Sequence, residues 1–211
     1  MKRPRVPKFP DARSLRASRR RFLAVSSFAL AGLALAPLRA FAAANGVSKR
    51  GAATNAVRIA EFADDGRPLR VVDLPTLVRS EAEWRKRLSP QAYDVTRNAG
   101  TERAYTGALL KNKAAGVYRC ACCGTALFDA KTKYESNTGW PSFWRAIARE
   151  NVIEREDLTY GMTRTEVACA RCDAHLGHVF DDGPPPTGLR YCMNSVALTF
   201  SPAAAARAAA K

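Results

Sequence analysis

The chain has 211 residues, which is enough for one domain with appended segments, and its formal net charge is +15. Residues 1–42 hold ten of the 34 basic residues and one of the 19 acidic residues, so the rest of the chain carries a net charge of +6. After residue 42, no basic block lies among spaced aromatic residues. The charge therefore gives no support for a nucleic-acid-binding protein, and we expect no nucleic-acid partner.

The first 42 residues have the pattern of an export signal. Three adjacent arginines at 19–21 precede an apolar run over 22–36, and Ala-x-Ala cleavage sites begin at Ala40 and Ala42. The run has 15 residues, whereas a membrane-spanning helix needs about 20, so a cleaved signal peptide is favoured over an uncleaved anchor. The adjacent arginines resemble a twin-arginine signal. That resemblance implies export of a folded protein to the periplasm, with no stable membrane association after cleavage.

The segment that follows predicts a linker and then two small helices. Residues 43–78 carry little periodicity and are expected to form a linker ending in the strand-like piece "RVVDLP". Ser80 and Glu83 have the spacing of a helix capping box. Ser89–Pro90 is typical of the start of a second helix, because proline fits the first helical position.

The remainder of the chain has the pattern of β-structure. From Gly116 onward, short apolar runs alternate with turn-forming residues, and the run at 196–200 has the two-residue period of a half-buried strand. We therefore expect a mainly β domain over 79–201, built of antiparallel sheets with small N-terminal helices. The alanine-rich residues 202–211 are expected to form a disordered tail.

Four of the six cysteines form two C-x-x-C pairs, Cys120 with Cys123 and Cys169 with Cys172. Each pair supplies two soft ligands, so the two pairs together satisfy one tetrahedral Zn²⁺ ion. Neither pair is followed by histidine, which excludes c-type haem attachment. Two disulfides or a dithiol redox motif are the alternatives. The paired spacing favours a structural, zinc-ribbon-like site.

Cys192 has no cysteine near it in the sequence, and it follows the two histidines of the chain, His175 and His178. The histidines are an alternative set of zinc ligands, although four thiolates already satisfy one ion. A free thiol with a pKa near 8.5 is mostly protonated at neutral pH. Cys192 therefore needs a cationic or hydrogen-bonding neighbour to act as a nucleophile, and His175, His178 and Arg190 are the candidates. A buried structural cysteine is the alternative.

Several separate motifs resemble those of peptide-methionine (R)-S-oxide reductases. They are "TGWPSF" (138–143), "HLGHVF" (175–180), "DDGPPPTGLRYCMNS" (181–195) and the two C-x-x-C pairs. The segment "EWRKRLSPQAYDVTRNAGTERAYTG" is similar to the N-terminal part of that family, so the resemblance covers about 79–200. It implies an enzyme that reduces methionine-(R)-sulfoxide in oxidised proteins, an oxidative-stress repair reaction. We expect a monomer with structural Zn²⁺ as its cofactor.

The same resemblance implies roles for individual residues. Cys192 attacks the sulfoxide sulfur and becomes a sulfenic acid, the first step of cysteine oxidation. His178 is the general acid, assisted by His175. Trp140 packs on the methyl group of the substrate, whereas without the resemblance plain core packing would be the preferred interpretation. The other residues expected to bind substrate or to hold the histidines and the thiolate are Phe180, Asp182, Arg190 and Asn194.

The return of the sulfenic acid to a thiol leaves two routes open. Many members of the family carry a resolving cysteine just before the "GWPSF" motif, but this chain has Thr138 there. Cys122 is the one thiol without another assigned role, and it lies inside the first C-x-x-C pair. Direct reduction by a thioredoxin-like donor is favoured over Cys122 as the resolving thiol. The sequence has no cofactor-binding loop, so the electrons are expected to come from a partner.

Two other classes of protein remain as alternatives. A metal-free thiol–disulfide oxidoreductase would use one C-x-x-C pair, and it predicts no tightly held metal. A non-enzymatic zinc-ribbon binding module would bind an acidic polymer in a salt-sensitive manner. This second alternative leaves "HLGH" and "GWPSF" without an explanation.

Overall fold

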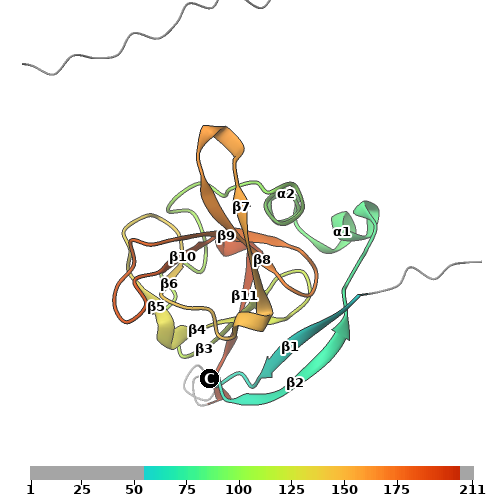
Figure 1. The fold of residues 1–211 in the computed structure, drawn as a ribbon, viewed down its shortest axis with the longest axis horizontal. Helices are drawn as coiled ribbons and strands as arrows, with labels where there is room; N and C mark the ends of the chain where they lie inside the picture. The colour runs from blue at the N-terminus through green and yellow to red at the C-terminus, as the bar shows by residue number, and fades with distance from the viewer. Residues whose placement is uncertain (1–54, 205–211) are drawn as a thin grey trace, which may run out of the picture. The chain divides into compact units, whose positions relative to one another are not determined.

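The computed structural model describes residues 55–204, which form antiparallel β-sheets with two short α-helices (Figure 1). The mainly β fold class expected from the sequence is confirmed. Within this range, no helix is long and apolar enough to cross a membrane. The predicted export signal lies outside the described residues, as does most of the predicted tail.

Two strands, β1 (Ala56–Phe62) and β2 (Pro68–Pro75), form an antiparallel hairpin before the helices. The linker predicted over 43–78 is therefore wrong for these residues, although the strand-like "RVVDLP" does lie in β2. The fully buried Asn151 binds the hairpin: its Oδ1 accepts from the Ala60 N–H and its Nδ2 donates to the Ala60 carbonyl, both at 2.8 Å. Because Asn151 lies 91 residues from Ala60, local sequence does not reveal this contact.

The two helices begin where the capping residues predict. Helix α1 (Glu81–Arg87) has Ser80 as its N-cap, with a reciprocal capping box to Glu83. Helix α2 (Pro90–Asn98) has Ser89 as its N-cap and proline in its first turn. Helix α2 packs on β9 and on the turn after β10, next to the candidate site.

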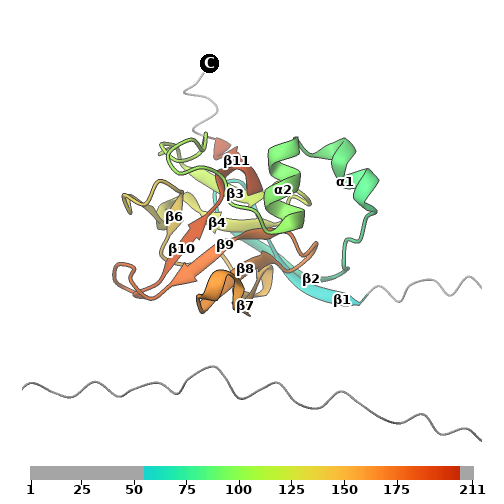
Figure 2. The same ribbon diagram turned by 90° about the horizontal axis from the view of Figure 1, so that it is seen from above.

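A six-stranded antiparallel sheet in the order β5-β6-β10-β9-β8-β7 carries the candidate catalytic residues, and a three-stranded sheet in the order β11-β3-β4 lies beside it (Figure 2). The strands of the larger sheet are β5 (Lys133–Tyr134), β6 (Ser142–Phe143), β7 (Val152–Asp157), β8 (Arg164–Cys169), β9 (His175–Phe180) and β10 (Arg190–Met193). The strands of the smaller sheet are β3 (Gly116–Cys120), β4 (Ala126–Asp129) and β11 (Leu198–Pro202). Four single-turn 3₁₀ helices lie between strands: η1 (Ala130–Thr132), η2 (Arg149–Asn151), η3 (Thr159–Gly161) and η4 (Ser195–Ala197).

The core contains aromatic side chains from both sheets. The rings of Phe128 and Phe143 stack with centroids 4.4 Å apart, and Tyr118 meets Phe143 edge-on at 4.9 Å. On β10, Tyr191 and Met193 are buried among these apolar residues. Because side chains alternate between the faces of a strand, Cys192 points to the opposite face of the sheet.

Candidate active site and metal centre

The sulfurs of the two C-x-x-C pairs form one cluster. The Sγ atoms of Cys120, Cys123, Cys169 and Cys172 all lie within 4.8 Å of one another. The Cys120–Cys172 and Cys123–Cys169 sulfurs lie 3.6 and 3.5 Å apart, well beyond the distance of about 2.05 Å in a disulfide, and all six cysteines are free. Four thiolates bound to Zn²⁺ at about 2.3 Å in a tetrahedron lie about 3.8 Å apart. The donors therefore fit a structural zinc ion.

The two C-x-x-C turns have the same backbone hydrogen bonds. The Gly124 N–H donates to the Cys120 carbonyl at 2.8 Å, and the Asp173 N–H donates to the Cys169 carbonyl at 2.9 Å. Gly124 and Asp173 both have positive φ angles, of 75° and 55°. This repeated turn directs two sulfurs to the same side of each loop, as a zinc-ribbon-like centre requires.

The candidate nucleophile lies in a row of polar side chains that crosses four strands. Cys192 on β10 is directly opposite His178 on β9 and Ser142 on β6, and His178 is opposite Glu166 on β8. Directly opposite residues of an antiparallel pair share one face of the sheet. At Gly177, an added Cβ would lie 2.1 Å from the Cys192 carbonyl oxygen, so the close approach of β9 to β10 requires glycine.

A β-bulge brings the two histidines together. Residues three apart on a regular strand point to opposite faces of the sheet. In the β8–β9 ladder, however, Val167 pairs with Gly177 and Ala168 pairs with His175, so Leu176 is an extra residue on β9. The rings of His175 and His178 consequently lie with their centroids 5.3 Å apart.

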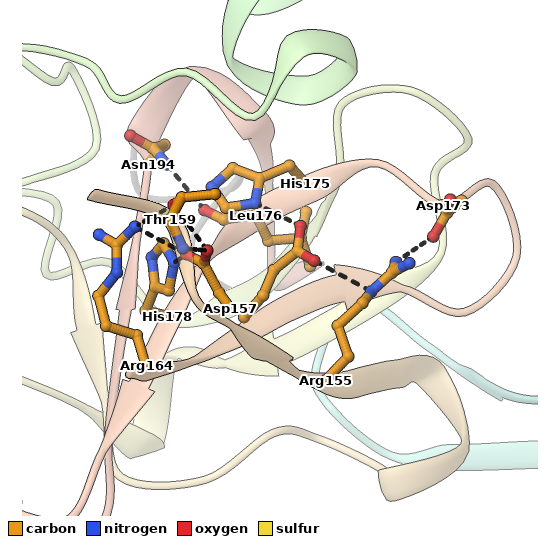
Figure 3. Close-up of polar contacts among 10 residues, drawn as sticks. Arg155, Asp157, Thr159, Arg164, Asp173, His175, Leu176, His178 and Asn194 are labelled. Carbon is orange, nitrogen blue, oxygen red and sulfur yellow. Dashed lines mark hydrogen bonds and ion pairs between the residues drawn. The ribbon is translucent and has the colours of Figure 1, made fainter. Parts of the chain in front are cut away.

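Each histidine is held by a carboxylate from β7 or β8 (Figure 3). Nε2 of His178 lies 2.8 Å from Oδ2 of Asp157, and Nδ1 of His175 lies 2.7 Å from Oε1 of Glu166. Arg164 also binds Asp157, at 2.7 Å. Asp157 and Glu166 were not among the residues predicted from the sequence, because the polar support of the histidines was expected from residues near Cys192.

Those residues near Cys192 have other partners. Asp182 forms a bidentate ion pair with Arg190, with both N–O distances at 2.8 Å. The Arg190 guanidinium also lies 4.3 Å from the centroid of the Phe180 ring. The Asn194 side chain donates to the Leu176 carbonyl at 3.1 Å and accepts from the Glu102 N–H at 2.9 Å. The expectation that these residues hold the histidines is corrected: Asp157 and Glu166 do so.

A small hollow of about 130 Å³ lies over Cys192. Trp140 is fixed in its wall, because its indole N–H donates to the Glu102 carbonyl at 3.1 Å. The structure thus brings the predicted nucleophile together with the predicted general acid and several predicted substrate-binding residues. The residues lining the hollow are Thr101, Trp140, Arg164, Gly177, His178, Phe180, Cys192 and Asn194.

The protonation of the central pair reflects its burial. Burial raises the pKa of the Cys192 thiol, while a hydrogen bond from Thr138, whose Oγ1 lies 3.8 Å from Sγ, and the charge of Arg190 act in the opposite direction. Burial also lowers the pKa of His178, and the hydrogen bond to Asp157 opposes that shift. Both groups are therefore held toward their neutral forms.

Cys122 lies away from this pair. Its neighbours are Cys120 and Cys172 of the cysteine cluster and Thr96 and Arg97 of α2. Within residues 55–204, the structure gives no contact between Cys122 and Cys192. The geometry therefore does not bring the candidate resolving thiol to the nucleophile.

The fold and the site define a β-sheet protein with a partly buried thiol opposite an imidazole and a separate cluster of four cysteines. The SelR domain model matches residues 88–202. The chain is 56% identical over 124 residues to a protein of Thiobacillus denitrificans named peptide methionine sulfoxide reductase MsrB, covering 59% of this chain and 94% of that protein. Proteins with the same name match from Synechococcus sp. (52% identical, covering 62% of this chain and 96% of that protein) and Methanosarcina barkeri (57% identical, 58% and 86%). The chain belongs to this SelR family of peptide methionine sulfoxide reductases.

Proposed function

We propose that this protein reduces methionine-(R)-sulfoxide residues in oxidised proteins to methionine, with Cys192 as the nucleophile. The observation that carries the proposal is the direct pairing of Cys192 with His178 on neighbouring strands, inside a hollow lined by Trp140. The relatives named above carry a matching name. The R epimer is proposed because the motifs resemble those of the R-specific family.

The reaction needs a nucleophile at sulfur and a proton for the departing oxygen. Cys192 attacks the sulfoxide sulfur, the oxygen passes to Cys192 as a sulfenic acid, and methionine leaves as the thioether. His178 lies opposite Cys192 and donates the proton that the sulfoxide oxygen gains. Its bond to Asp157 fixes the orientation of the imidazole and stabilises the charged form from which the proton comes.

The substrate methyl group would pack on Trp140. The indole is held by its hydrogen bond to Glu102, and Phe180 supplies a second aromatic ring in the same hollow. Aromatic faces bind sulfur-bound methyl groups favourably. Asp182 and Arg190 act from beside the hollow, where the Arg190 charge opposes the effect of burial on the Cys192 thiol.

We propose that an external thioredoxin-like dithiol regenerates the enzyme. One thiol of the donor attacks the Cys192 sulfenic acid, releasing water and forming a mixed disulfide. The second donor thiol then displaces Cys192 as a thiol, so that the donor leaves as a disulfide. Thr138 and not a cysteine lies beside Cys192, and Cys122 lies in the cysteine cluster, which supports this route.

Cys120, Cys123, Cys169 and Cys172 would hold a structural Zn²⁺ ion that joins the β3–β4 turn to the β8–β9 turn. We also propose export to the periplasm by the twin-arginine route, supported by the arginines at 19–21 and the short apolar run, and we propose that the protein acts there as a monomer. Cell fractionation of wild type and of a variant with Arg19, Arg20 and Arg21 changed to Lys tests the export: the variant should stay in the cytoplasm.

The decisive experiment supplies peptides with each sulfoxide epimer, together with dithiothreitol, and quantifies the methionine formed. Wild type should convert the R epimer, and Cys192→Ser should convert neither. Full turnover by Cys192→Ser would contradict the proposal. If insulin reduction survived in that variant and no metal were bound, a thiol–disulfide oxidoreductase would be indicated instead. Mass spectrometry after a single turnover tests the regeneration route, since a Cys122–Cys192 disulfide would contradict direct reduction.

A further inference from the structure

The hollow at Cys192 has room for one side chain. Its volume of about 130 Å³ is about four times the share of one water molecule in the liquid. A methionine sulfoxide side chain has five heavy atoms, so the hollow holds this group and little else. The polypeptide on either side of an oxidised methionine must therefore lie outside the hollow.

A larger groove of about 550 Å³ adjoins the hollow and shares Thr101, Arg164 and His178 with it. One wall is the end of the β7–β8 hairpin, and the other is the segment that follows α2. In Figure 1 the hairpin projects at the top of the view with α2 beside it. The other residues lining this groove are Asn98, Ala99, Gly100, Glu156, Asp157, Leu158, Thr159, Glu166 and His175.

The turn at the end of the hairpin carries two exposed apolar side chains, and one of them lines the groove. Leu158 is 64% exposed and lines the groove, and Met162 in the same turn is 51% exposed. The turn is tied to the site, because Oδ1 of Asp157 accepts from the Thr159 N–H at 2.9 Å and from its hydroxyl at 2.6 Å. These bonds hold the backbone of the turn that carries Leu158 beside the reactive site, so a segment bound in the groove would cover the Leu158 side chain.

The charges of the groove leave one acidic residue unpaired. Asp157 is paired with His178 and Arg164, and Glu166 is paired with His175 and Arg155. Glu156 is exposed and has no ion-pair partner in the described part of the chain. The groove should consequently attract a basic side chain more strongly than an acidic one.

We propose that this groove binds the polypeptide next to the oxidised methionine, with Leu158 contacting an apolar flanking side chain and Glu156 favouring a basic one. The inference rests on the proposed function, because the groove has this role only if the hollow receives the methionine sulfoxide. The occupant of the groove is then an extended segment of the protein substrate. The protein thus distinguishes polypeptide substrates from isolated methionine sulfoxide by Leu158 and Glu156, which take no part in the chemistry.

The test compares a hexapeptide containing methionine-(R)-sulfoxide between phenylalanine and lysine residues with N-acetyl-methionine-(R)-sulfoxide methylamide. Leu158→Asn should lower kcat/KM for the peptide about fivefold, through KM, since about 40 Å² of apolar contact is lost. It should leave kcat/KM for the blocked amino acid within about twofold of wild type. Val71→Asn is the matched control, because Val71 is 56% exposed on β2 and lines neither hollow nor groove.

Reversing the charge of Glu156 provides a second, independent test of the groove. At low ionic strength, Glu156→Lys should shift the preference between lysine-flanked and glutamate-flanked peptides about threefold toward the acidic peptide, and the shift should fade with added salt. The assignment of the groove would be overturned if Leu158→Asn changed kcat/KM equally for the peptide and the blocked amino acid. It would also be overturned if Leu158→Asn had the same kcat/KM values as Val71→Asn. If wild type reduces neither substrate, the proposed function itself fails.

Discussion

Replacing Asp157 by Asn removes the negative charge that faces His178 at 2.8 Å while leaving a side chain of the same size. In the wild-type protein, burial lowers the pKa of His178, and the hydrogen bond to Asp157 raises it. Without the carboxylate, burial acts unopposed and the nearby charge of Arg164 lowers the pKa further. The pKa of His178 should therefore fall in Asp157→Asn.

The size of the change follows from the geometry. A hydrogen bond to a charged group contributes about 1.5 kcal/mol or more, which is roughly tenfold in an equilibrium constant. If His178 donates the proton, kcat/KM declines as the pH rises through the His178 pKa, because the protonated fraction is lost. The declining limb should move to lower pH in Asp157→Asn, and at a pH above that limb the rate should fall about tenfold.

The assay is the pH profile of kcat/KM for N-acetyl-methionine-(R)-sulfoxide methylamide with dithiothreitol as reductant. Asp182→Asn is the matched control, because Asp182 pairs with Arg190 and makes no contact with either histidine in the structure described. That control should keep the His178 limb in place. An unchanged limb in Asp157→Asn, with the variant folded, would refute the assignment of His178 as the proton donor.

Three further predictions concern the metal centre, the hairpin contact and the neighbour of the nucleophile. Cys120→Ser should lose stoichiometric zinc by elemental analysis and lower Tm, since structural zinc contributes on the order of 10 kcal/mol to folding; a metal-free wild type would contradict this. Asn151→Ala should lower the free energy of unfolding in urea by about 2–4 kcal/mol, because buried backbone groups lose their partners, with the blocked substrate still reduced. Thr138→Cys should form an intramolecular disulfide with Cys192 after turnover, because Thr138 Oγ1 lies 3.8 Å from Cys192 Sγ. Mass spectrometry detects this disulfide, and its absence would contradict the position of Thr138 beside the nucleophile.

The fold class could be predicted because its signals are local. Ser80 with Glu83 and Ser89 with Pro90 marked the two helix starts, and both helices begin there. The C-x-x-C pairs predicted a cluster of four sulfurs because each turn fixes two of them, whatever the path of the chain between the turns. The β1–β2 hairpin was missed because Ala60 is held by Asn151, a contact that depends on the tertiary fold.

The partners of the histidines could not be predicted for a related reason. The pairing of Asp157 with His178 and of Glu166 with His175 depends on the register of β7, β8 and β9. A one-residue change in register reverses which side chains share a face, and the extra residue Leu176 makes such a change within β9. Sequence motifs identified the histidines, but their carboxylates are set by cross-strand geometry.

The structure places Cys192 apart from the cluster of four cysteines, and strand β9 connects the two places. Cys169 and Cys172 lie in the turn that leads directly into β9, and the Cys169 N–H donates to the Ala174 carbonyl at 2.9 Å, immediately before His175. A metal ion that fixes this turn therefore also fixes the start of the strand that carries both histidines. Loss of the ion should therefore destabilise the fold and the active site together. When Cys120→Ser is heated, its activity and its folded fraction should decline in parallel. Cys192→Ser should instead keep the wild-type Tm and have no activity at any temperature.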